Sequence, residues 1–142
     1  MAFRCDSLTS RTPLGIIELG EVCARHRAIC LDLFEQLGAL VTADGTPAGA
    51  DQQRYAVACH QHASHAELWS KRAPSIPPLQ LDGGFEQSVS RSRGTNQPVT
   101  DAASYLRATE ALTNELTGLL ARTDPLLDPS TARVISLVLA DL

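Results

Sequence analysis

The sequence predicts an all-α protein: one domain over residues 1–142 that forms an antiparallel four-helix bundle. Aromatic residues make up only 4% of the chain whereas Ala and Leu abound, which suits close helix packing better than a β-sandwich. Apolar residues recur with a helical period in four segments that are separated by proline, glycine and polar residues. The fourth segment is short, and a long irregular crossover separates the second from the third.

The first helix is expected to follow a polar lead at residues 1–13 and to run to about Val41. Thr12 is a suitable cap and Pro13 a suitable first helical residue. The predicted buried stripe carries a histidine and cysteines among its leucines. It consists of Leu19, Val22 or Cys23, His26, Ile29 or Cys30, Leu33, Leu37 and Leu40.

The second helix is expected to begin at Thr46-Pro47 and to end near Arg72. The turn before it is short, so the first two helices should be antiparallel neighbours. Positions whose numbers sum to about 92 should then lie level with each other. This places Cys30 opposite His62, and His26 opposite His65 or Ala66.

Residues 74–98 are rich in proline and glycine and form the predicted crossover. The third helix is expected to start at Thr100 or Asp101 and to end before Asp124-Pro125. Asp128-Pro129 should open the last helix, which extends to Leu142. Its apolar side is predicted to contain Val134, Leu137, Val138 and Leu142.

The histidines of the second helix are the most informative residues. His62 and His65 fall on its apolar stripe together with Cys59 and Trp69. A buried imidazole needs a hydrogen-bond partner for each nitrogen, or a metal ion for one of them. Side chains or water on facing helices would satisfy the first requirement, and a metal centre in the bundle core would satisfy the second.

Two ligand sets are compatible with the predicted faces. One uses His26, Cys30, His62 and His65, and its imidazole and thiolate groups favour zinc or another borderline-soft metal. A buried cysteine is also an ordinary core residue, and no Cys-x-x-Cys spacing is present.

The other set adds carboxylates to the inward histidines and would hold two iron or manganese ions. Its acidic members are Glu35, Glu67, and Glu110 or Glu115. Each of these is also a plausible surface residue; Glu67 and Lys71, for example, have the spacing of a helical ion pair.

The formal net charge of −4 disfavours binding to nucleic acid or to anionic membranes. No segment has the length and hydrophobicity of a signal peptide or a membrane span. The four cysteines lack the spacing of a secreted disulfide framework, which favours reduced thiols and a cytoplasmic location. A nucleophilic Cys59 activated by His62 is disfavoured because an apolar environment keeps a thiol protonated.

Three segments resemble small actinobacterial helical proteins of the ferritin-like superfamily: LFEQLG at 33–38, HQHASHAELWSKRAP at 60–74, and DPSTARVISLVLADL at 128–142. The resemblance implies a four-helix bundle with a metal site between its helices. It matches Glu35 to the first ligand glutamate, and Glu110 or Glu115 to that of the third helix. His62-x-x-His65 stands where the superfamily has Glu-x-x-His, and the fourth helix lacks that motif.

We therefore expect a ferritin-like bundle that binds iron, manganese or zinc, or acts as an oxidoreductase, with an altered or lost di-metal site. The alternative is a non-catalytic assembly module, in which a groove beside the short fourth helix receives a second copy or a partner helix. A third possibility is an organic ligand in the bundle core.

Overall fold

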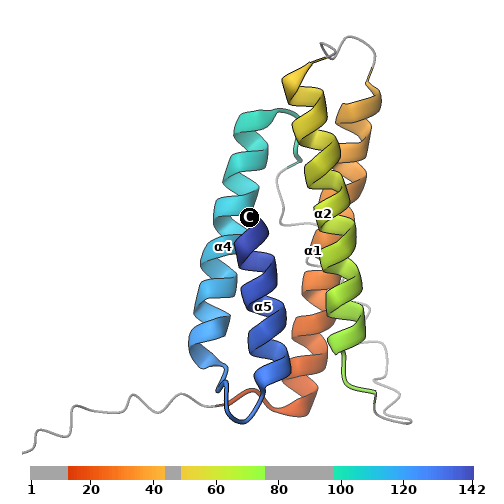
Figure 1. The fold of residues 1–142 in the computed structure, drawn as a ribbon. Helices are drawn as coiled ribbons and strands as arrows, with labels where there is room; N and C mark the ends of the chain where they lie inside the picture. Colours follow the sequence, from red (N-terminus) through yellow and green to blue (C-terminus); the bar gives the residue numbers. More distant parts are fainter. Residues whose placement is uncertain (1–12, 44–48, 76–97) are drawn as a thin grey trace, which may run out of the picture.

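The computed structural model describes residues 13–43, 49–75 and 98–142 of the chain. Over these residues it is all helical and contains no strand, which confirms the predicted all-α class. The helices are α1 (Ile16–Thr42), α2 (Ala50–Arg72), α4 (Ala102–Arg122) and α5 (Pro129–Asp141). Figure 1 shows α1 and α2 running side by side in opposite directions, with α5 ending about halfway along α2 and α4. Most of the predicted crossover and the polar lead lie outside the described residues.

The starts of α4 and α5 confirm the sequence prediction. Asp101 caps α4: its carboxylate accepts a hydrogen bond from the Ser104 backbone N–H at 2.7 Å, and the Ser104 hydroxyl accepts one from the Asp101 N–H at 3.0 Å. Asp128 caps α5 by accepting from the Thr131 N–H at 3.1 Å, and Pro129 is the first helical residue.

The predicted start of α1 was wrong. The helix begins at Ile16, and its N-cap is Gly15, which has extended backbone angles and no side-chain cap. Pro13 therefore precedes the helix, while Thr12 lies outside the described residues. Leu14 packs against the core, and the extended backbone at Gly15 delays the first helical turn beyond the Thr-Pro pair.

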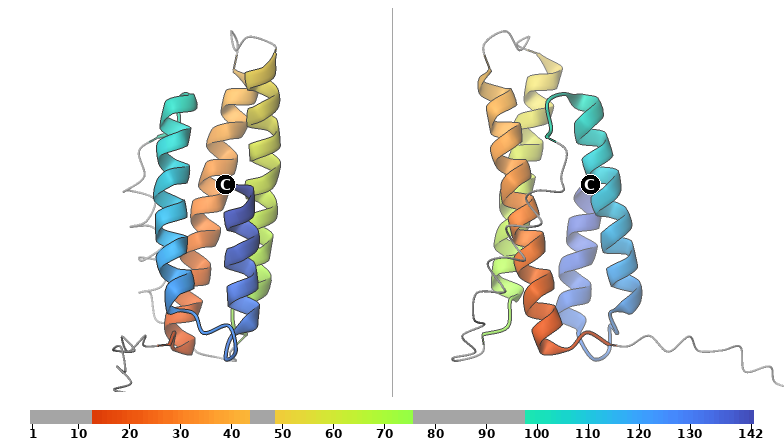
Figure 2. Two further views of the ribbon diagram at one scale, coloured as in Figure 1. Left: turned by 60° about the vertical axis from the view of Figure 1, so that its left-hand side comes forward. Right: turned by 180° about the vertical axis from the view of Figure 1, so that it is seen from behind.

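The helices pack unequally, and α1 and α2 form the closest pair. Helix α5 contacts both α2 and α4, whereas no Cα atom of α4 lies within 8 Å of one in α1 or α2. Side chains bridge these wider separations; Arg25 of α1, for example, donates to Glu115 of α4 at 3.0 and 3.2 Å. A surface pocket of about 240 Å³ lies between α1 and α4. Figure 2 shows α4 and α5 on one side of the α1–α2 pair.

The core follows the predicted apolar stripes closely in α1, α2 and α4. The exception is Leu137 of α5, which the sequence analysis placed on the apolar side although 44% of its surface is exposed. Ile135 is fully buried instead, because α5 turns Thr131, Ile135 and Val138 towards its neighbours. The largest fully buried side chains of the core are Trp69, Leu37, Leu116 and Ile135.

One polar cluster fixes the position of α5. The Arg72 guanidinium at the end of α2 donates to both carboxylate oxygens of Asp128 at 2.9 Å and to the Thr131 hydroxyl at 2.7 Å. One guanidinium nitrogen contacts both carboxylate oxygens and a second donates to the hydroxyl, and hydrogen bonds between charged groups such as these are stronger than neutral ones. This cluster ties the start of α5 to the end of α2 and so sets where the far end of α5 meets the middle of α2.

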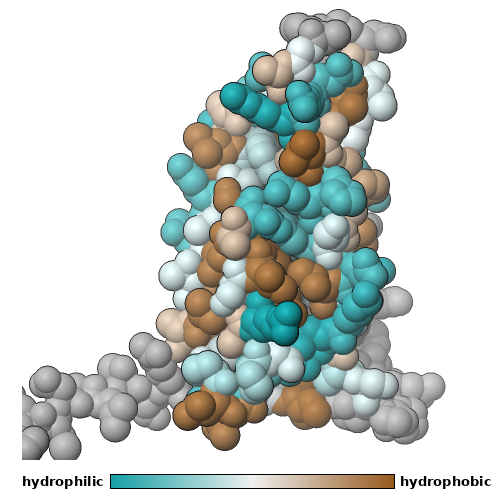
Figure 3. All heavy atoms as spheres, in the orientation of Figure 1, coloured by the Kyte–Doolittle hydropathy of each residue, from teal (hydrophilic) through white to brown (hydrophobic). Residues whose placement is uncertain are grey.

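The surface is mixed in character. Figure 3 shows apolar side chains in separate patches with hydrophilic residues between them. Within the described ranges, no helix has both the length and the hydrophobicity needed to cross a membrane.

Candidate metal centre

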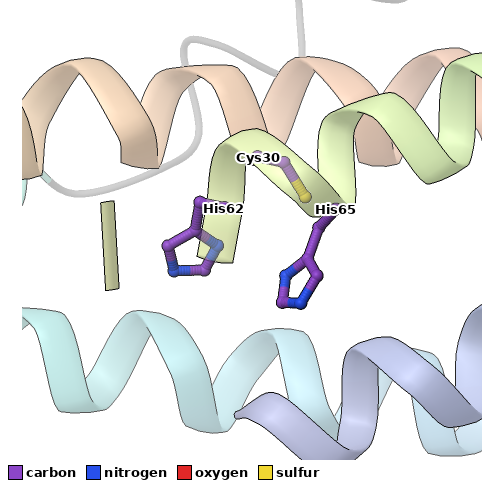
Figure 4. Close-up of side chains that lie close together, drawn as sticks. All are labelled: Cys30, His62 and His65. Carbon is purple, nitrogen blue, oxygen red and sulfur yellow. The ribbon is translucent and has the colours of Figure 1, made fainter. Parts of the chain in front are cut away.

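Cys30, His62 and His65 bring their side chains together in the core. Cys30 comes from α1 and the two histidines from α2, and each is only 1% exposed. One donor atom from each residue can be chosen so that all of them lie within 4.8 Å of one another. Figure 4 shows the sulfur of Cys30 close to the His65 ring, with both rings pointing from α2 towards α4 and α5. This buried group could hold a metal ion.

The arrangement follows from helix periodicity and from the α1–α2 pairing. A spacing of three residues puts His62 and His65 on the same face of α2, about one turn apart. Their ring centroids are 5.7 Å apart, and the ring planes are nearly perpendicular at 86°. Cys30 lies level with His62, as the antiparallel pairing predicts.

The outer nitrogens of both rings are hydrogen-bonded to residues of the other two helices. His62 Nε2 lies 3.0 Å from the Tyr105 hydroxyl of α4, and His65 Nε2 lies 2.9 Å from Asp141 Oδ2 of α5. A carboxylate can only accept, so Nε2 of neutral His65 carries the proton and its Nδ1 bears a lone pair. The Nδ1 atoms of both rings are buried and have no hydrogen-bond partner among the described residues, and the same holds for Nε2 of His26 and Nε1 of Trp69.

Burial also sets the protonation of these groups. Desolvation, helped by the neighbouring His65, lowers the pKa of His62 to about 4, so that this ring is neutral at physiological pH. Burial raises the pKa of Cys30 to about 12, so that the free thiol is protonated. The neutral imidazole is ready to bind a metal ion, whereas the thiol must release its proton on binding.

His26 belongs to a different part of the core. It was predicted to lie level with His65 or Ala66, but it stacks on Trp69, with ring centroids 4.9 Å apart and an interplanar angle of 28°. Trp69 follows Ala66 by about one turn, and because helical side chains point back towards the N-terminus its ring reaches the level of that turn. Burial lowers the pKa of His26. Its Nδ1 donates to the Val22 carbonyl at 2.8 Å, and its Nε2 lies 3.5 Å from Glu115 Oε1.

The candidate carboxylates lie on the surface. Glu35, Glu67 and Glu110 are exposed. Glu67 forms an ion pair with Lys71, with Oε1 and Nζ 2.7 Å apart. Glu115 is 38% exposed and is bound by Arg25 through both of its oxygens. None of these glutamates belongs to the Cys30, His62 and His65 group in the described part of the chain.

Two residues of the centre were not identified from the sequence. The sequence analysis assigned no role to Tyr105 or Asp141. Both lie in helices that are far from α2 in sequence, and the Arg72 cluster ties only the start of α5 to α2. The sequence indicated that each buried histidine needs a hydrogen-bond partner, but it did not indicate which residue is that partner.

A scan against protein-family models, a search of curated proteins and a search of solved structures each found no match.

Proposed function

We propose that this protein binds one transition-metal ion through Cys30 Sγ and the Nδ1 atoms of His62 and His65. The scaffold in this proposal is an antiparallel four-helix bundle with a ferritin-like order of helices and an altered metal site. The directions of the helices in Figure 1 and the position of the long crossover support that order.

The main support is the pairing of unsatisfied and satisfied nitrogens. Each unsatisfied buried polar atom costs about 1–3 kcal/mol. Nε2 of His26 and Nε1 of Trp69 are also without a partner among the described residues, but only the Nδ1-bearing rings of His62 and His65 lie together with a thiol. Here both free Nδ1 atoms belong to rings that place their other nitrogen beside Tyr105 or Asp141. Metal-binding histidines commonly use one nitrogen for the ion and donate the other N–H to a carboxylate or another oxygen.

The donor types argue against a di-iron or di-manganese oxidase. Iron and manganese pairs in helical bundles are bridged by several inward carboxylates. The matching residues, Glu35, Glu67 and Glu110, are exposed, and Glu115 is held by Arg25. One thiolate and two imidazoles suit a single ion of soft or borderline character. The function proposed here is accordingly metal binding at a mononuclear centre.

The test is the metal content of protein purified without an affinity tag. We expect one equivalent of bound metal in the wild type, and none in His62→Ala or His65→Ala. His60→Ala is the matched control, because His60 lies on the same helix but is exposed. Chelation should lower the melting temperature of the wild type only. Metal-free wild-type protein that gains no thermal stability from any first-row metal would refute the proposal.

A second candidate is assembly with another copy or with a partner helix. Leu106 of α4 and Val57 of α2 are 59% and 53% exposed, and an open pocket of about 380 Å³ lies beside Leu142 where α5 ends. Light scattering would test this role. A dimer that Leu106→Ser dissociates supports it, and a monomer at all concentrations refutes it for self-association.

A further inference from the structure

We infer that the ion held by Cys30, His62 and His65 is copper, bound by these three ligands alone. The inference rests on the proposed function and adds the identity of the metal and its coordination number. It follows from what surrounds the three donors.

Within residues 13–43, 49–75 and 98–142, no fourth histidine, cysteine or carboxylate joins the group. The histidines, cysteines and carboxylates of the described chain supply only Cys30, His62 and His65 to it. The nearest carboxylate and phenol of known placement, those of Asp141 and Tyr105, are hydrogen-bonded to the outer ring nitrogens. They lie on the opposite edge of each ring from the Nδ1 atoms.

The position also offers no route for a water ligand from the surface pocket between α1 and α4. That pocket lies between α1 and α4 and is lined by side chains such as Arg25, Gln36 and Glu115, not by the three donors. All three donor residues are 1% exposed. An ion in this position is therefore surrounded by protein and has two nitrogen ligands and one sulfur ligand.

Three ligands of this kind distinguish copper from zinc. Zinc in proteins is almost always four-coordinate: a structural site provides four protein ligands, and a catalytic site provides three and an open position for water. Trigonal sets of two histidines and one cysteine, whose only further ligand is a weak and distant axial one, are instead characteristic of copper sites that transfer electrons. A thiolate also favours copper(I), which is a soft ion.

The hydrogen bonds to the outer ring nitrogens support a rigid trigonal arrangement. Tyr105 and Asp141 hold the two rings from α4 and α5, while Cys30 is fixed on α1, so each of the four helices contributes to the centre. Such outer contacts fix the orientation of a ligand ring. The half-exposed carboxylate of Asp141 also connects the His65 ring directly to the protein surface.

The experiment adds copper(I) to metal-free protein under anaerobic conditions, in competition with a chromophoric copper(I) chelator. Copper X-ray absorption of the loaded protein then gives the number and type of ligands. We expect one copper ion with two nitrogen neighbours, one sulfur neighbour and no fourth ligand. Cys30→Ser should weaken binding at least 100-fold, whereas Cys59→Ser should leave it unchanged. Cys59 is the control because it is a partly exposed thiol of α2 outside the group.

The outcomes separate this inference from the proposed function. Tight binding of one zinc ion that copper(I) does not displace, or copper with a fourth ligand, would overturn the inference and leave the metal-binding function intact. Failure of the wild type to bind copper(I), zinc or any other first-row transition metal would overturn both. The absorption measurement on wild-type protein decides the coordination number even if a variant fails to fold.

Discussion

The core contains two histidine-bearing regions that differ in how their second ring nitrogen is used. At the candidate metal centre, α4 and α5 hold the outer nitrogens of His62 and His65, and the Nδ1 atoms have no hydrogen-bond partner among the described residues. One turn away along α1, His26 bonds to its own backbone and stacks on Trp69, with an arginine-bound carboxylate nearby. Both regions are buried, so burial alone does not identify a metal site. The regions differ in that Cys30, His62 and His65 bring three potential metal-binding atoms together, whereas His26 has no such neighbours among the described residues.

The largest expected difference between the two regions is in metal content. His62→Ala should abolish stoichiometric metal binding because it removes one of three ligands, a larger loss than the roughly 10- to 100-fold typical of outer-shell changes. His26→Ala should retain one equivalent of metal, because its ring donates to Val22 and lies outside the ligand group. Elemental analysis of both folded variants measures the difference. Equal loss in the two would remove the distinction between the regions.

For folding stability, we expect the region around His26 and Trp69 to be the more sensitive of the two. Trp69 is fully buried and stacks on His26, so Trp69→Ala should lower the free energy of unfolding by about 3–5 kcal/mol. Trp69→Phe should lower it less because it retains an aromatic ring. Chemical denaturation of metal-free protein gives both values, and both variants should still bind one metal ion when folded. Loss of metal from folded Trp69→Phe would show that the two regions are coupled.

A substitution at a residue that only hydrogen-bonds to a ligand ring should lower metal affinity without abolishing metal binding. Asp141→Asn replaces the carboxylate that accepts from His65, and we expect a fall in metal affinity of about 10- to 100-fold. Glu115→Gln is the control, since it changes the carboxylate nearest to His26 and should leave affinity unchanged. Competition with a chelator measures both. An unaltered affinity in Asp141→Asn would mean that this contact does not orient the ligand.

The pH dependence of stability is the most gradual of these effects. Because the folded pKa of His62 is lowered to about 4, the unfolded chain takes up this proton first as the pH falls below about 6.5. The contribution of His62 to the free energy of unfolding of metal-free protein should therefore be fully present above that pH. Between that pH and pH 4 it should fall by up to about 1.4 kcal/mol per pH unit. His62→Gln should flatten the slope, and His60→Ala should not. Denaturation midpoints between pH 4 and 7 test this.

The sequence was sufficient to predict the regions governed by local rules. Periodicity located the four helices and placed His62 and His65 in the core, and capping chemistry located the starts of α4 and α5. The short turn after α1 also placed Cys30 level with His62. These features depend on contacts that are close in sequence or linked by a short connection.

Features that depend on distant segments could not be predicted in the same way. The partners Tyr105 and Asp141 reach the centre from α4 and α5, whose positions follow from the packing of whole helices. The stacking of His26 on Trp69 depends on the exact alignment of α2 along α1, which the sequence does not give. The surface positions of Glu35, Glu67 and Glu110 likewise depend on how each helix is rotated about its axis.

The most direct test of the central claim is a crystal structure of metal-loaded protein with diffraction data collected at the absorption edge of the metal. The account predicts one strong anomalous peak at bonding distance from Cys30 Sγ and from the Nδ1 atoms of His62 and His65. A peak beside His26 and Glu115, or at surface carboxylates with none between Cys30 and the two histidines, would contradict it.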